Sequence, residues 1–299
     1  MKYANFFGLG SAALLLLISS AAVAEESLFG YMRGAETLPQ GARELVHHLT
    51  RRWDKGAGEY TAYDSKIELE YGVTDRFSSG YYLLGQSVNT RGLLIDAYIP
   101  KDESSGLKLS GFEVSAKYNF LSPVTENIGL SAYVSGTYMN LDATSGQKKD
   151  RYNVETWMMA QKNFLDDQLV WVGNLGLEST YAHRKPLDGL PDGFEWPAHP
   201  EMEIAILFGS GVSYRVAPNW FVGAEALYAS ENETVVGEER WSLQAGPNIH
   251  YAEKEWWFTL SWMPQLRGGG GMFPEQNDTR LHLIEKTKQE VRFIVGYEF

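Results

Sequence analysis

The chain has 299 residues, a formal net charge of -12 and no cysteine. An acidic chain does not suit a nucleic-acid partner, because phosphate binding needs clustered Lys and Arg. The lack of cysteine excludes a disulfide scaffold, thiolate metal ligands and thiol catalysis. Aromatic residues make up 13% of the chain, including 9 Trp and 17 Tyr. Such rings are typical of the two interfacial girdles of a membrane barrel.

The first 24 residues have the pattern of a secretory signal peptide. Lys2 supplies the positive start, an apolar run covers Phe6–Ile18, and Ala22 and Ala24 fit a small-residue cleavage site. The run is shorter than the roughly 20 residues that a membrane-spanning helix needs. We therefore expect export, with a mature protein that begins at Glu25.

Residues 25–40 show neither a strand period nor a capped helix pattern. They contain Leu28, Phe29, Tyr31 and Met32 within five positions. This segment is either a disordered lead-in used in assembly or a small plug in the periplasmic mouth of a barrel. Because four large apolar or aromatic residues are costly to leave in water, we expect it to be at least partly ordered.

Residues 41–299 are predicted to form one domain, an all-β, antiparallel, up-and-down transmembrane β-barrel of about twelve strands. Period-two segments bounded by turn residues give these strands. They are Ala42–Trp53, Tyr60–Gly72, Phe77–Asn89, Leu107–Leu121, Ile128–Leu141, Tyr152–Leu165, Leu169–Arg184, Glu201–Val216, Trp220–Ser230, Arg240–Tyr251, Trp256–Gln265 and Glu290–Phe299.

The connections between these strands alternate in length. Five are short and predicted to be periplasmic turns, namely 74–75, 122–127, 166–167, 217–219 and 252–255. Six are longer and carry Gly, Pro and charge, namely 55–59, 90–106, 142–151, 185–200, 231–239 and 266–289. Short periplasmic turns and longer extracellular loops are typical of outer-membrane barrels. An even strand number then leaves both chain ends on the periplasmic side.

The last strand alternates apolar and polar residues and ends on an aromatic residue. We interpret its apolar face as an assembly signal that faces lipid; its residues are Phe293, Val295, Tyr297 and Phe299. Clean alternation elsewhere predicts that Phe112, Ile67 and Ile204 also face lipid. Glu113, Lys66 and Glu203 then face a polar lumen.

The predicted lumen carries both signs of charge. The candidate lumen or solute-path residues are Glu44, His48, Arg52, Lys66, Glu68, Glu70, Glu113, Lys117, Glu178, Glu203, Arg215, Glu225, His250 and Arg292. These groups either pair with one another across the lumen or line a solute path. Twelve strands lie between the eight that side chains just fill and the sixteen that leave a water channel, so size does not decide.

Enzyme and metal patterns are weak. His183 and Ser179 share one face, but four strand residues separate them by more than about 13 Å, and no Gly-x-Ser-x-Gly pattern occurs. We therefore expect no enzyme, no metal site and no cofactor. Two acidic loop groups are alternatives as divalent-cation sites, and their residues are Asp188, Asp192, Glu195 and His199, and Glu231, Glu233, Glu238 and Glu239.

The start of the predicted mature chain resembles a family of uncharacterised Gram-negative outer-membrane β-barrel proteins. The resemblance rests on the stretches 28–39, 61–64 and 70–77, which cover about the first third of the chain. The last of these, Tyr-Gly-Val-Thr-Asp-Arg-Phe, suits a tight turn with aromatics at the membrane interface. The resemblance implies the architecture and the location, and it implies no substrate or catalytic residue.

The sequence as a whole predicts a narrow outer-membrane channel or transporter for small polar solutes. The alternative is a closed structural or adhesion barrel that acts through its extracellular loops, and a lipid hydrolase is a third possibility. Expected partners are outer-membrane lipid, lipopolysaccharide, the barrel-assembly machinery and a small polar solute.

Overall fold

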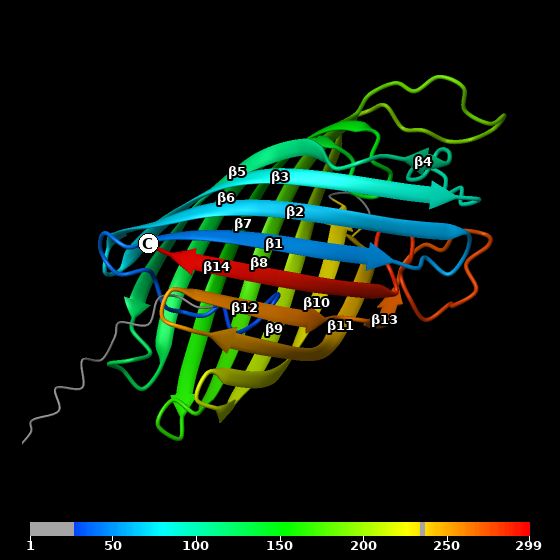
Figure 1. The fold of residues 1–299 in the computed structure, drawn as a ribbon. Helices are drawn as coiled ribbons and strands as arrows, with labels where there is room; N and C mark the ends of the chain where they lie inside the picture. Colours follow the sequence, from blue (N-terminus) through cyan, green and yellow to red (C-terminus); the bar gives the residue numbers. More distant parts are fainter. Residues whose placement is uncertain (1–26, 234–236) are drawn as a thin grey trace, which may run out of the picture.

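The computed structural model describes residues 27–233 and 237–299, and they form a closed antiparallel barrel (Figure 1). Within these residues twelve strands close the ring in up-and-down order, and two short strands lie outside it. The predicted signal peptide, residues 1–24, falls outside the described residues. Among the described residues, no helix has the length and apolar character needed to cross a membrane.

The twelve predicted strands are confirmed, with ends that shift by a few residues. The strands are β1 (Arg43–Trp53), β2 (Glu59–Thr74), β3 (Phe77–Arg91), β4 (Glu103–Ser104), β5 (Lys108–Leu121), β6 (Gly129–Leu141), β7 (Lys148–Phe164), β8 (Leu169–Arg184), β9 (Glu201–Ala217), β10 (Trp220–Glu233), β11 (Gly237–Ala252), β12 (Trp256–Trp262), β13 (Gln265–Gly269) and β14 (Gln289–Glu298). The sequence did not predict β4 or β13 as separate strands.

Closure of the ring depends on β14. This strand pairs with β1 from Glu44–Glu298 to Trp53–Gln289, and with β12 on its other side. The chain therefore begins and ends its barrel at the same end, where Phe299 donates its main-chain amide to the carbonyl of Arg43. The short turns gather at this short-turn end, and the longer connections lie at the opposite, long-loop end (Figure 1).

The outer face of the barrel is apolar, as the alternation predicted. Phe112 is 53% exposed, Ile67 45% and Ile204 45%, whereas Glu113 is buried. In β14, Phe293, Tyr297 and Phe299 are likewise exposed, and Val295 is half-buried. A continuous belt of exposed apolar side chains around a closed barrel is the arrangement that lipid requires.

The predicted strand 256–265 needs a correction. The strand breaks after Trp262, and β13 resumes pairing with β11 at Gln265 in the same register, which shifts by one residue between Gln265 and Arg267. Pro264 explains the break, because proline cannot donate to the ladder and is found at bulges. Gly268 and Gly269, which the sequence places in the long connection 266–289, therefore belong to β13.

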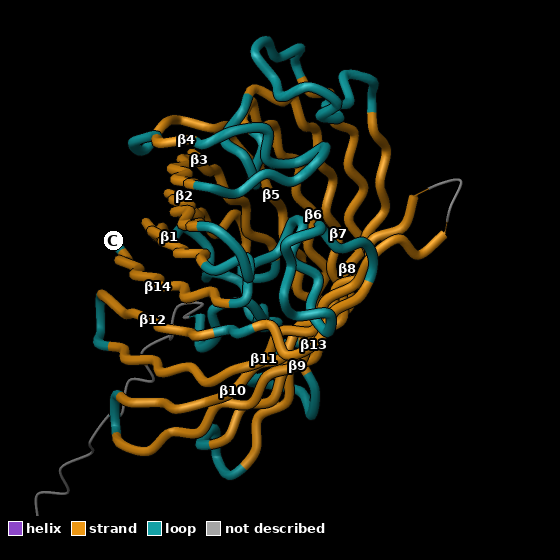
Figure 2. Tube along the Cα trace, turned by 90° about the vertical axis from the view of Figure 1, so that its right-hand side faces the viewer, coloured by secondary structure: helices purple, strands orange, loops and turns teal. Residues whose placement is uncertain are grey.

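Segments of chain fill the lumen from both ends. Figure 2 shows loops lying across the ring of strands. Near the short-turn end, Phe29 and Met32 pack on Val170 and Val172 of β8. At the long-loop end, loop residues pack into a larger apolar cluster, whose buried members are Tyr60, Ala62, Val88, Leu93, Ile95, Ile99, Phe273, Leu281 and Leu283.

Gly296→Ala should destabilise the closure of the ring. Gly296 lies opposite Trp257, and a Cβ at Gly296 would overlap the buried indole. Overpacking of this kind typically costs about 1–3 kcal/mol. We expect a lower urea midpoint of unfolding in lipid vesicles, followed by tryptophan fluorescence. Gly136→Ala is the matched control, because nothing lies within 4 Å of its added Cβ; an equal loss in both variants would contradict this account of closure.

Candidate lumen site

The N-terminal segment, residues 27–40, is anchored by the carboxylate of Glu225 on β10. Glu225 is buried and accepts three successive main-chain amides, from Gly30 at 2.9 Å, Tyr31 at 2.8 Å and Met32 at 3.0 Å. Ser261 on β12 donates its hydroxyl to the same carboxylate at 2.7 Å. Such charge-assisted hydrogen bonds are strong and offset the cost of burying a carboxylate.

Further along the segment, neutral side chains bind its main chain. The amide of Arg33 donates to Asn174 Oδ1 at 2.7 Å, and Asn174 Nδ2 donates to the carbonyl of Arg33 at 2.9 Å. Ala35 donates its amide to Gln161 Oε1 at 2.8 Å, and its carbonyl accepts Asn119 Nδ2 at 2.6 Å. Side chains of the wall thus replace the ladder partners that an irregular chain lacks.

Arg292 on β14, directly opposite Ser261 in the β12–β14 ladder, also holds the segment. Its guanidinium donates to the carbonyl of Gly30 and to Thr50 Oγ1, both at 2.9 Å. It also lies 3.9 Å from the centre of the Tyr31 ring, and the Tyr31 hydroxyl donates to Glu290 at 2.7 Å. The segment is therefore held through its main chain and the Tyr31 side chain, in addition to the packing of Phe29 and Met32 on β8.

Glycines on β9 make room for the apolar side chains of the segment. A Cβ at Gly211 would lie 2.6 Å from the ring of Phe29, and one at Gly209 would overlap Met32. Both apolar side chains are buried. The wall is therefore shaped to the segment.

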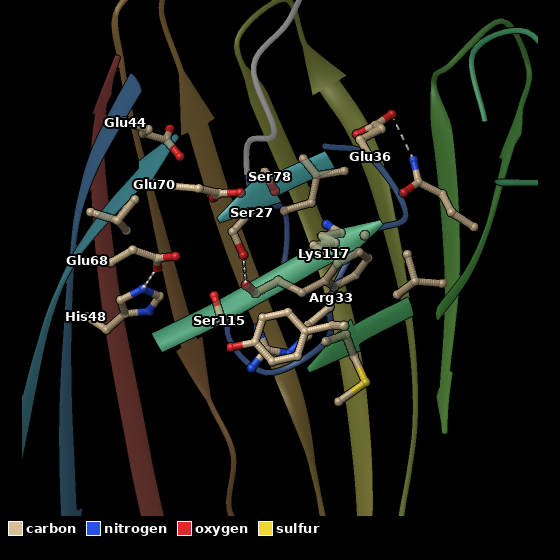
Figure 3. A pocket seen from close by; sticks show the side chains of 18 of the residues that line it. Ser27, Arg33, Glu36, Glu44, His48, Glu68, Glu70, Ser78, Ser115 and Lys117 are labelled. Atoms are coloured by element: carbon tan, nitrogen blue, oxygen red, sulfur yellow. Dashed lines mark hydrogen bonds and ion pairs between the residues drawn. The ribbon is translucent and has the colours of Figure 1, made fainter. Parts of the chain in front are cut away.

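A cavity of about 110 Å³ lies between the segment and the wall. Glu44 on β1 and Glu68 and Glu70 on β2 line one side, and Figure 3 shows their carboxylates pointing into it. Lys117 on β5 and Arg33 of the segment line the opposite side. The cavity therefore has an acidic side and a basic side.

At the long-loop end, Arg240 on β11 gathers four carboxylates. Its guanidinium lies 2.6–3.0 Å from carboxylate oxygens of Glu203, Glu231, Glu239 and Glu285. Glu285 belongs to the β13–β14 loop, residues 270–288, where burial and the nearby carboxylate of Glu231 raise its pKa to about 8. This network ties the loop to β9, β10 and β11.

Lys55, in the β1–β2 turn, is buried and holds the same loop. Its Nζ donates to the carbonyls of Leu283 at 3.2 Å, Ile284 at 2.9 Å and Lys286 at 3.0 Å. Burial, together with the charge of Arg52, lowers the pKa of Lys55 well below its ordinary value. The β13–β14 loop is thus fixed by one ammonium group, an ion network and an apolar cluster.

Within the described part of the chain, the structure brings seven of the fourteen predicted lumen residues into ion pairs between different strands. The pairs, each with its closest distance between a side-chain nitrogen and a carboxylate oxygen, are His48–Glu68 at 3.0 Å, Arg52–Asp64 at 2.6 Å, Lys66–Glu113 at 2.9 Å, Arg151–Glu178 at 2.5 Å and Arg240–Glu203 at 2.7 Å.

The remaining predicted residues have separate places. Glu225 and Arg292 bind the N-terminal segment, and Glu44, Glu70 and Lys117 line the cavity. Glu44 also accepts the indole N–H of Trp257 at 2.5 Å, and buried His250 contacts Thr259 Oγ1 at 2.8 Å. Arg215 lies at the short-turn rim, where it donates to the carbonyl of Asp166.

Sequence reasoning missed the neutral side chains that bind the N-terminal segment. Three of these side chains occupy inward positions, namely Asn174, Gln161 and Asn119, but the predicted lumen residues included only ionisable groups. It also missed Arg240 and Lys55, whose partners come from loops distant in sequence. The alternation of inward and outward residues showed which side chains point into the lumen, but it did not show which groups they bind.

Two histidine findings bear on the hydrolase alternative. His183 contacts the carbonyl of Ala198, whereas His47 Nε2 lies 2.9 Å from Ser65 Oγ on the outer face of β1 and β2. This cross-strand pair was missed because its residues are 18 positions apart. A catalytic triad would need a further group to orient the histidine. Among the described residues, no group of three His, Cys, Asp or Glu could hold a metal ion.

Comparison with known proteins identifies the architecture. A family model described as "Family of unknown function (DUF6662)" matches residues 21–299, and no curated protein matches the chain. An outer-membrane channel from Pseudomonas putida F1 is similar, with a TM-score of 0.58, 15% identity and coverage of 89% of this chain and 98% of that one. The β domain of the Bordetella autotransporter BrkA gives a TM-score of 0.50, 12% identity and coverage of 87% and 100%. At these identities the likeness shows the fold alone.

Glu225→Gln should loosen the N-terminal segment. The amide side chain keeps one acceptor oxygen but loses the charge that binds Gly30, Tyr31 and Met32. Loss of one hydrogen bond to a charged group is worth about 1.5–3 kcal/mol, so hydrogen exchange at these amides should accelerate roughly tenfold or more. Glu126→Gln, on an exposed turn, is the matched control. Unchanged exchange at residues 30–32 would show that Glu225 does not anchor the segment.

Acid should loosen the β13–β14 loop through His282. Burial and the nearby cations Arg240 and Lys286 lower the pKa of His282 to about 3. Because this pKa lies below that of a free histidine, the closed loop keeps the full contribution of His282 above about pH 6.5 and loses it as the pH falls toward 3. Between pH 8 and pH 5 the closed-to-open ratio should fall by roughly 30-fold.

The measurement is hydrogen exchange across residues 270–288 as a function of pH, corrected for the intrinsic pH dependence of exchange. His282→Asn should flatten the pH dependence, and the difference between the two proteins isolates His282 from Lys55 and Glu285. A pH dependence identical in both proteins would exclude this role.

Proposed function

The chain belongs to the family of unknown function whose model matches it, and we propose that it is a narrow, gated channel for small polar solutes in the outer membrane of a Gram-negative bacterium. The N-terminal segment is the gate. The observation that carries the proposal is the binding of three main-chain amides of this segment to the single carboxylate of Glu225.

A twelve-stranded barrel lies between the width that side chains just fill and the width that leaves a water channel. In this protein the N-terminal segment takes up part of the lumen. Water or a polar solute can replace its polar main-chain contacts when the segment leaves. Removal of the segment would leave a lumen lined by charged side chains, which suits polar solutes.

The location and the remaining partners follow from the outer surface and are part of the same proposal. The exposed apolar belt is suited to outer-membrane lipid, with the short-turn end in the periplasm and the long loops toward lipopolysaccharide. The exposed face of β14, together with the Phe299 that follows it, would be recognised by the barrel-assembly machinery. The name of the similar channel from Pseudomonas putida F1 agrees with a channel function.

A closed barrel that acts through its long loops is the second candidate. The apolar cluster at the long-loop end favours it, because Leu283, Phe273 and Ile99 pack as a core would. The two candidates differ in whether the lumen ever opens.

Solute uptake separates the two candidates. Proteoliposomes containing the protein should swell with arabinose but not with raffinose, because the lumen is narrow. Glu225→Gln should raise the arabinose rate several-fold by releasing the gate, and Glu126→Gln should not. Folded protein that admits neither sugar in either form would contradict the channel and leave the closed barrel.

A further inference from the structure

The acidic side of the cavity brings carboxylates together on neighbouring strands. Glu44 on β1 is directly opposite Glu70 on β2 and, on its other side, Glu298 on β14. Like charges directly opposite one another destabilise a sheet. Glu44 is only 1% exposed, so water screens this repulsion poorly. The arrangement favours a cation in the cavity.

Small polar residues line part of the cavity. Ser78 on β3 and Ser115 on β5 both face it, and the buried hydroxyl of Ser78 lies beside the Glu70 carboxylate. These short side chains leave space next to the carboxylates for a small polar ligand.

The basic side faces these carboxylates. Lys117 lies opposite Ser78 in the β3–β5 ladder and is buried. Arg33 lies 4.0 Å from the centre of the Tyr133 ring and 4.0 Å from Glu155. Since β3 alone separates β2 from β5, the main chains that carry Glu70 and Lys117 are about 10 Å apart. A short ligand with one charge of each sign spans this gap.

The geometry points to a binding site for a small zwitterion of the α-amino acid class, an inference that rests on the proposed function because it names the solute of that channel. The ligand's ammonium group meets Glu44 and Glu70, and its carboxylate meets Lys117 and Arg33. The cavity volume of about 110 Å³ is several times the roughly 10–15 Å³ that one water requires, so the cavity admits a small ligand. A ligand with a single charge would interact favourably with only one of the two sides.

Isothermal titration calorimetry on the full mature protein in detergent tests the site with three matched probes. L-Alanine carries both charges, propionate lacks the ammonium group and ethylammonium lacks the carboxylate. Each missing charge removes charge-assisted hydrogen bonds, so L-alanine should bind at least about tenfold more tightly than either analogue. No binding of L-alanine, or binding no tighter than propionate or ethylammonium, overturns the inference.

Variants locate the site. Glu70→Gln and Lys117→Met should each weaken L-alanine binding about tenfold or more, whereas Glu126→Gln should leave it unchanged. Circular dichroism checks the fold, and if a variant does not fold, the three-probe comparison on the unaltered protein still decides. Equal affinity in folded Glu70→Gln and Lys117→Met would place the bound alanine elsewhere and overturn the site.

The same protein preparation keeps this inference separate from the channel. L-Alanine binding without any solute uptake by proteoliposomes would contradict the proposed channel and retain the site. Arabinose uptake without L-alanine binding would retain the channel and contradict the site.

Discussion

Closure of the ring between β14 and β1 is the constraint on which the rest of the structure depends. Once these two strands pair, the strand number fixes the width of the lumen, and twelve strands lie between a barrel that side chains just fill and one that leaves a water channel. Empty polar space inside a barrel would leave charged groups without partners. In this protein, segments of the chain itself occupy the lumen from both ends.

The two segments are held by different balances of apolar packing, ion pairs and hydrogen bonds. The β13–β14 loop combines a large apolar cluster with the Arg240 network and the buried ammonium of Lys55. The N-terminal segment combines hydrogen bonds from its main chain to Glu225, Asn174 and Gln161 with a smaller apolar cluster. Apolar burial resists water, whereas polar contacts exchange with it. This difference is why we assign the gate to the N-terminal segment.

Much of the fold could be predicted because alternation carries it directly. The strand Leu169–Arg184 was predicted to the residue, and the lipid-facing side of β5 and β9 followed from a period of two. The break at Pro264 could not be predicted in this way, because apolar residues continue to alternate on both sides of it. The site was harder still. Alternation showed that Glu225 points inward, but its partners are main-chain amides some 195 positions earlier in the chain. Every residue except proline has such an amide, so the sequence does not indicate which ones Glu225 binds.

Single-channel recording in a planar bilayer can compare the mature protein with a variant that lacks residues 27–38. We expect brief, small openings for the mature protein and larger, long-lived steps for the variant, because the lumen loses its gate. Silence from both proteins, with folded barrels in the membrane, would contradict this expectation.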